Sequence, residues 1–126
     1  PLTGMNNSGK AVKEFCINQG LLLSNVHVIV DDIDLPLGKL RIRPKGGDGC
    51  HRGMESIIYQ NRDNNFPRIR FGIAVGSKLR PSEQYVLKDF KKSDQNLADE
   101  MIVRAADAAE LIFEDGLNKA MNKYNA

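Results

Sequence analysis

The chain has 126 residues, of which 41% are hydrophobic and 27% are charged, and its formal net charge is +2. This length fits one domain with one hydrophobic core. No apolar run approaches the roughly 18 to 20 residues that a membrane span requires. The first residues also lack the charged and apolar segments of a secretory signal. We therefore expect a cytoplasmic protein that does not enter a membrane.

The two cysteines occupy unlike settings. Cys16 falls within a helical pattern, whereas Cys50 falls in a glycine-rich segment, so we expect two free thiols and not a disulfide framework. The two histidines, His27 and His51, do not combine with these cysteines in any zinc-site spacing. The sequence predicts neither a bound metal nor a cofactor.

Positive charge is concentrated in the middle of the chain. Residues 39–80 contain ten Lys and Arg against three acids, a local excess of +7. A patch of one sign attracts polyanions, and each neutralised phosphate releases counterions. This pattern favours an RNA-binding surface, although a solubilising surface would show the same composition.

Four helices are predicted. The first covers residues 10–19, with Asn7 or Ser8 as its cap and Gly20 at its end. The second runs from residue 53 to about residue 61. Ser93 can cap a long third helix that ends near residue 114, and a short fourth helix covers residues 117–123.

Three strands are predicted between these helices. Residues 26–30 are nearly continuous apolar residues, as in a strand buried on both faces, and Asp31 follows at its carboxyl end. His27 inside this run is interpreted as a packed side chain. Residues 39–43 alternate basic and apolar, and residues 68–73 form the third strand, with arginines that we expect on the same basic surface. The class is α/β, one domain with a mixed, mostly parallel sheet flanked by helices.

The segment from Asp31 to residue 53 carries the strongest functional signal. Carboxylates at Asp31, Asp32 and Asp34 follow a strand, and a basic, glycine-rich segment at residues 45–53 comes shortly after. Carboxylates can orient or accept a proton, and glycines let backbone N–H groups approach a ligand closely. The pattern is typical of an active site that meets a polyanion.

Four separate motifs in this order resemble bacterial-type peptidyl-tRNA hydrolases. They are residues 3–9 (Thr-Gly-Met-Asn-Asn-Ser-Gly), 31–38 (Asp-Asp-Ile-Asp-Leu-Pro-Leu-Gly), 45–53 (Lys-Gly-Gly-Asp-Gly-Cys-His-Arg-Gly) and 68–73 (Arg-Ile-Arg-Phe-Gly-Ile). The resemblance implies an enzyme that hydrolyses the ester between a peptide and the 3′ ribose of tRNA. It also implies tRNA as the partner, and we expect a monomer.

The resemblance implies roles for individual residues. Asp31 matches the carboxylate that orients a catalytic histidine, and Asn6 matches an amide that binds substrate or oxyanion, although Asn6 could instead be a helix-entry cap. Family positions that contact tRNA match Arg43, Arg70 and Lys78. Lys45 is added from the charge pattern, and His51 and Arg52 are included as substrate-binding positions of the glycine-rich segment.

The chain also departs from the family pattern. The Thr-Arg-His-Asn motif that carries the catalytic histidine does not occur. Arg52 replaces an asparagine and so cannot accept a hydrogen bond. Gly4 replaces an aromatic residue, and Cys50 and Ala74 replace glycines.

Three interpretations explain these departures. The sequence is a record or fragment that lacks the N-terminal part of an active hydrolase, or it is a non-catalytic RNA-binding relative similar to splicing factors. In the third interpretation, His51 acts as a substitute base. The first is preferred, and it predicts that these 126 residues alone bind tRNA but hydrolyse peptidyl-tRNA slowly or not at all.

Overall fold

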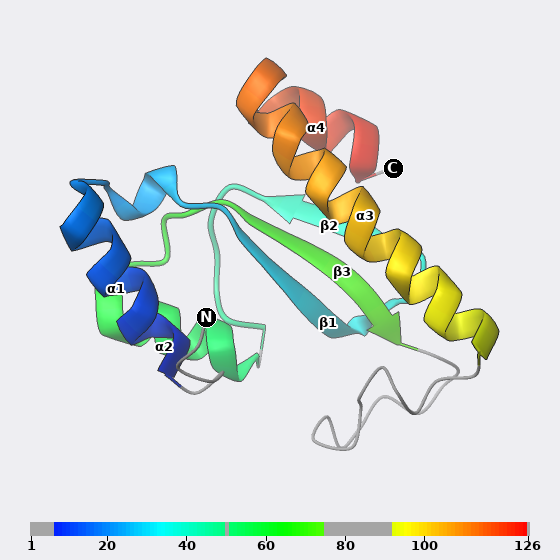
Figure 1. Ribbon diagram of the computed structural model, residues 1–126, viewed down its shortest axis with the longest axis horizontal. Coiled ribbons are helices and arrows are strands. Elements are labelled where there is room, and N and C mark those ends of the chain that lie inside the picture. The colour runs from blue at the N-terminus through cyan, green and yellow to red at the C-terminus, as the bar shows by residue number, and fades with distance from the viewer. Residues whose placement is uncertain (1–6, 50, 75–91, 126) are drawn as a thin grey trace. The chain divides into compact units, whose positions relative to one another are not determined.

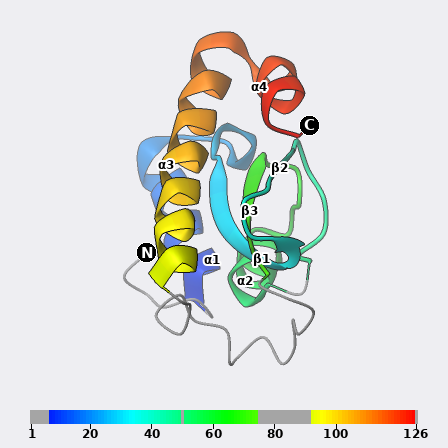
Figure 2. The same cartoon turned by 90° about the vertical axis from the view of Figure 1, so that its right-hand side faces the viewer.

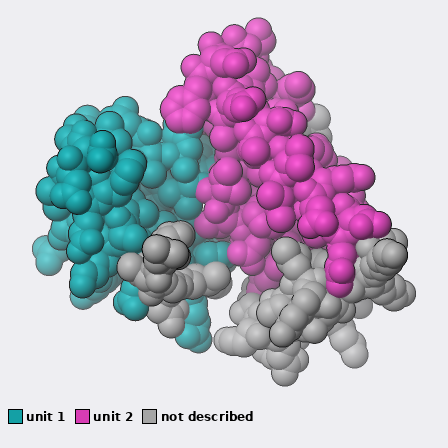
Figure 3. Space-filling view, viewed as in Figure 1, with its two compact units in different colours: residues 1–28, 43–68 teal, residues 29–42, 69–126 magenta. Residues whose placement is uncertain are grey.

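The computed structural model describes residues 7–49, 51–74 and 92–125. The chain divides into two compact units, shown in different colours in Figure 3. Unit 1 comprises residues 1–28 and 43–68, and unit 2 comprises residues 29–42 and 69–126. The predicted single-domain organisation stays a prediction.

Unit 1 is built around two packed helices. Helix α1 (Ser8–Gln19) ends at Gly20, which adopts the left-handed conformation with φ of 65° as predicted. Helix α2 (Arg52–Asn61) lies beside it (Figure 1), and the backbone N–H of Gly9 donates to Ser56 Oγ at 2.9 Å. The short 3-10 helix η2 (Leu23–Asn25) follows α1 in the chain. Both predicted helices of this unit are therefore confirmed.

The sheet has three strands in the order β1-β3-β2. They are β1 (Val28–Pro36), β2 (Leu40–Arg43) and β3 (Arg68–Ala74). The arrows in Figure 1 show that β1 and β3 run parallel and that β2 runs antiparallel to them. Helices and a mixed sheet confirm the predicted α/β class.

Strand β1 differs from its prediction. It begins two residues later than expected, so His27 precedes it, and it continues to Pro36, so Asp31 lies inside the strand and not after it. Leu37 lies nine positions after Val28, whereas their acceptors on the β3 side, Pro67 and Ala74, are seven positions apart. The two extra positions in β1 relative to β3 indicate a β-bulge in β1.

The core of unit 2 lies between the sheet and helix α3 (Lys92–Asp115). Figure 2 shows α3 alongside the sheet, with α4 (Leu117–Tyr124) following it. The apolar spacing predicts a buried stripe at Leu97, Met101, Ala105, Ala108 and Ile112, and the last four are buried while Leu97 is half-buried. Ala98 is also buried, and Ser93 lies inside the helix and not before it.

The exposed edge of β2 receives an unusual partner. The side-chain amide of Asn125 donates to the Ile42 carbonyl at 3.0 Å, and its oxygen accepts from the Ile42 N–H at 2.7 Å. This pair of bonds imitates a neighbouring strand. Because unpaired strand edges invite association with other chains, Asn125 protects part of this edge.

Among the described helices, none combines the length and apolarity that crossing a membrane requires.

His27 gives unit 1 a predicted pH dependence. Burial lowers the pKa of His27 below its ordinary value of 6.5. The unfolded chain therefore binds more protons just below about pH 6.5, so the free energy of unfolding falls as the pH drops through this region. We expect His27→Gln to lose less thermal stability than the wild type between about pH 8 and about pH 5.5. Thermal unfolding is measured by circular dichroism at both pH values. An equal loss of thermal stability in the two proteins would contradict this assignment.

Candidate active site and RNA-binding residues

The predicted site residues are distributed over both units. Asp31 and Arg70 belong to strands of unit 2, and Arg43, Lys45, His51 and Arg52 belong to unit 1. Asn6 and Lys78 lie outside the described residues, so their roles stay predictions. The structure therefore defines two groups of candidate residues.

In unit 2, the acidic segment of β1 is internally ordered. One carboxylate oxygen of Asp32, Oδ1, accepts the backbone N–H of Asp34 at 2.8 Å. This bond fixes the chain next to Asp31, whose side chain is partly buried. The bond therefore orders the backbone of the residues that directly follow Asp31.

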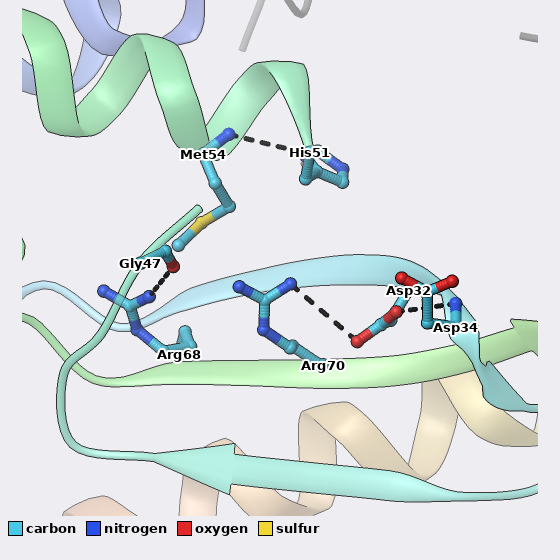
Figure 4. A network of polar contacts seen from close by, with 7 residues as sticks. All are labelled: Asp32, Asp34, Gly47, His51, Met54, Arg68 and Arg70. Atoms are coloured by element: carbon cyan, nitrogen blue, oxygen red, sulfur yellow. Dashed lines mark hydrogen bonds and ion pairs between the residues drawn. The ribbon is translucent and has the colours of Figure 1, made fainter. Parts of the chain in front are cut away.

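Arg70 forms an ion pair with Asp32 and is largely shielded from solvent. Its Nη1 lies 3.8 Å from Asp32 Oδ2, and the two side chains are only 11% and 18% exposed (Figure 4). Arg70 was predicted from its family position to contact tRNA. Since its charge is already paired with a carboxylate, a phosphate could use this arginine only by sharing or replacing Asp32.

In unit 1, residues 44–51 connect β2 to α2 and are called the glycine loop, and residue 50 among them lies outside the described residues. Arg43 and Lys45 are exposed at its start. Gly46 and Gly49 have positive φ angles of 147° and 59°, which residues with a side chain rarely adopt. The glycines therefore allow the loop to take its path, and the two cations are accessible to an anion.

His51 ends this loop by capping α2. Its Nδ1 accepts the Met54 N–H at 3.2 Å (Figure 4), and its backbone carbonyl accepts from Glu55. With Nδ1 acting as an acceptor, a neutral His51 carries its proton on Nε2 and presents a donor there. A general base needs a free acceptor, so this geometry does not favour His51 as a substitute base.

Arg68 corrects the prediction that both arginines of β3 join the basic surface. Its side chain is 1% exposed. The guanidinium donates to the carbonyls of Phe66, Gly47 and Asn64 at 3.1, 2.8 and 3.0 Å, and it lies 4.4 Å from the centre of the Phe66 ring. The alternation of residues along the strand predicted that Arg68 and Arg70 lie on one exposed face. The sequence pattern contained no sign of the backbone carbonyls that Arg68 binds.

Arg52 opens helix α2 beside a hollow of about 440 Å³ in unit 1. The side chain is exposed, as expected of a residue that could meet an RNA phosphate. The other described residues that line the hollow come from the same helix: Glu55, Ser56, Tyr59 and Gln60.

Across residues 7–49, 51–74 and 92–125, no three His, Cys, Asp or Glu side chains gather as a metal site would require.

Comparison with known proteins decides the family. The family model described as peptidyl-tRNA hydrolase matches residues 1–126. The chain belongs to the peptidyl-tRNA hydrolase family. The family that the sequence resembles is thereby confirmed.

Relatives within this family share the whole length of the chain. A peptidyl-tRNA hydrolase of Thermoanaerobacter sp. (strain X514) is 46% identical over 125 residues, which are 99% of this chain and 67% of the relative. That of Desulforudis audaxviator is 42% identical over 126 residues, 100% of this chain and 63% of the relative.

A crystal structure from the family has the same fold. Peptidyl-tRNA hydrolase from Acinetobacter baumannii matches with a TM-score of 0.85 and 33% identity, covering 100% of this chain and 64% of that structure. The chain thus spans about two thirds of the length of the relatives and structures that it matches.

Proposed function

We propose that the protein hydrolyses the ester bond between a peptide and the 3′ ribose of tRNA. The observation that carries this proposal is the family match over all 126 residues, with the Asp31 motif and the glycine loop in their expected order. The matched relatives named above are peptidyl-tRNA hydrolases. Nothing in these matches favours the alternative of a non-catalytic RNA-binding relative. The proposed location is the cytoplasm, where translation uses tRNA, and the proposed state is a monomer.

Asp31 and Asn6 are proposed to serve the chemistry. A carboxylate that accepts a hydrogen bond from an imidazole fixes its tautomer and stabilises the imidazolium that forms as water attacks the ester. Asn6 would donate its amide to the substrate or to the oxyanion, a contact worth about 10² to 10³ in rate. Neither His27 nor His51 is assigned as the base.

Six residues are proposed to contact the RNA, and the structure distinguishes among those that it describes. Arg43, Lys45 and Arg52 have exposed cationic side chains. Arg70 is paired with Asp32, so its contribution depends on that carboxylate. His51 and Lys78 complete the proposed set. Contacts to phosphates by such side chains carry no sequence information, which suits an enzyme that accepts many tRNAs.

The experiment that tests the activity is ester cleavage by the protein. A labelled peptidyl-tRNA is incubated with the protein, and free peptide and intact tRNA are separated and quantified. Enzymes typically reach about 1 to 10³ turnovers per second, far above spontaneous ester hydrolysis. Binding of the tRNA with no cleavage above the spontaneous rate would indicate an RNA-binding protein instead.

The basic residues predict a change in the salt dependence of tRNA binding. Each lost phosphate contact should reduce the slope of log affinity against log salt concentration by about 0.7 to 0.9. We therefore expect this reduction for Arg43→Ala and again for Lys45→Ala. Lys10→Ala, which removes an exposed cation from α1, is the matched control and should keep the wild-type slope. Unchanged slopes in all three variants would remove Arg43 and Lys45 from the RNA contact.

A further inference from the structure

We infer that Arg68 is a positioning residue that holds the glycine loop in the shape in which it meets RNA. This inference deepens the proposed function and rests on it for the substrate. Arg68 is one of two buried polar or charged side chains among the described residues. A charged side chain is rarely fully buried unless its partners are fixed.

The bonds of Arg68 join two segments that are distant in sequence. Its Nη1 donates to the carbonyl of Gly47 in the glycine loop, 21 residues away. Its Nη2 donates to Asn64, and Asn64 also accepts the N–H of Gly46 at 3.3 Å. The loop is therefore fastened to residues 64–68 by a short network through Gly46 and Gly47.

The guanidinium itself is fixed from two further sides. Its Nε donates to the Phe66 carbonyl, and its plane lies over the fully buried Phe66 ring. Such stacking adds to the hydrogen bonds and restricts rotation of the guanidinium. The direction of the Nη1 bond to Gly47 is therefore set by the protein interior.

The other end of the loop has its own anchor. The N–H of His51 donates to the Asp48 carbonyl at 3.0 Å, and His51 caps α2. The loop is thus held at Gly46–Gly47 by Arg68 and at His51 by the helix. Lys45 lies immediately before the first anchor and Arg52 immediately after the second. Both proposed RNA contacts consequently depend on where the anchors place the loop.

Arginine suits this task better than lysine would. A planar guanidinium donates in several fixed directions at once, whereas an ammonium is one centre with three freely rotating donors. Lysine at position 68 would keep the charge and reach fewer of the three carbonyls. The variant Arg68→Lys therefore separates the geometry of the bonds from the charge.

The test compares Arg68→Lys with wild type in amide hydrogen exchange and in peptidyl-tRNA hydrolysis. We expect the amide of Gly46 to exchange about tenfold faster, as loss of a hydrogen bond worth about 1.4 kcal/mol implies, while the separately anchored amide of His51 and the amides of α3 keep their rates. We expect KM for peptidyl-tRNA to rise about tenfold by the same estimate, with kcat within about twofold.

Arg104→Lys is the matched control because Arg104 also donates its guanidinium to a backbone carbonyl, that of Gly38 at 3.1 Å, outside the loop. It should leave both the loop amides and KM unchanged. The inference is overturned if Arg68→Lys leaves loop exchange and KM at wild-type values. It is also overturned if all amides accelerate equally, since that pattern is general destabilisation.

A measurement on the wild type covers the case in which Arg68→Lys fails to fold. The Nε–H and Nη–H protons of Arg68 should exchange slowly with water in NMR spectra, whereas fast exchange would overturn the inference. The exchange measurements need no substrate. If the wild type does not hydrolyse peptidyl-tRNA, the proposed function fails, and loop exchange still decides whether Arg68 holds the loop.

Discussion

Replacing Gly72 with alanine is expected to lower the free energy of unfolding by about 3 kcal/mol or more, because overpacking against rigid atoms lies at the upper end of such costs. Gly72 lies in β3, where a Cβ atom would overlap the backbone carbonyls of Leu35 and Pro36 in β1. Backbone atoms of a paired strand cannot rotate away as a side chain can. The two strands would have to separate beside Leu35 and Pro36.

Urea denaturation of the protein measures this effect. Gly47→Ala is the control because a Cβ there meets no atom within 4 Å and its backbone is not left-handed. It should change the free energy of unfolding by about 0.5 kcal/mol or less. Similar stabilities of Gly72→Ala and Gly47→Ala would show that the strands are not as close as the structure places them.

Gly9→Ala is expected to have a comparable effect on unit 1, lowering the free energy of unfolding by about 2 to 3 kcal/mol. A Cβ at Gly9 would overlap the carbonyl group of Ser56 in α2. The N–H of Gly9 also donates to Ser56 Oγ, so moving α1 away would break this bond. The close approach of α1 and α2 therefore requires glycine at this position.

Thermal unfolding checks the Gly9 prediction. A stability loss of this size should lower Tm by roughly 5 to 15 °C. Gly47→Ala again serves as the control. A Tm of Gly9→Ala within about 1 °C of the wild type would contradict the packing of α1 on α2 through this residue.

Local signals predicted the helices well. Gly20 ends α1 because the left-handed conformation that it adopts is cheap only for glycine. The apolar spacing along α3 predicted a buried stripe, and Met101 and Ala105 are fully buried. Each of these features depends on residues within a few positions of one another, so one sequence contains the necessary information.

Features set by distant residues were predicted less well. The extent of β1 depends on its pairing with β3 and on the bulge, so the apolar run at residues 26–30 gave neither end correctly. Asp31 was expected to follow the strand and lies within it. The bond from the Asp34 N–H to Asp32 that orders this segment is made by polar residues, so the apolar pattern gave no signal of it.

The arginines of β3 show the same limit for the candidate site. Their spacing of two correctly suggests that Arg68 and Arg70 share a face of the strand. Whether that face meets solvent depends on the glycine loop and on Asp32, which supply acceptors from other parts of the sequence. The motif therefore indicated a functional segment, while the distinct environments of its two arginines required the folded chain.

The most direct test of the proposed chemistry is to measure peptidyl-tRNA hydrolysis and tRNA affinity together for Asp31→Asn. General acid and base assistance contributes about 10² to 10⁴ in rate, so we expect kcat/KM to fall in this range while tRNA affinity stays within about twofold of the wild type. Asp34→Asn, a change at an exposed position of the same strand, should retain activity. Hydrolysis by Asp31→Asn at the wild-type rate, or a loss of rate matched by an equal loss of tRNA affinity, would contradict a chemical role for Asp31.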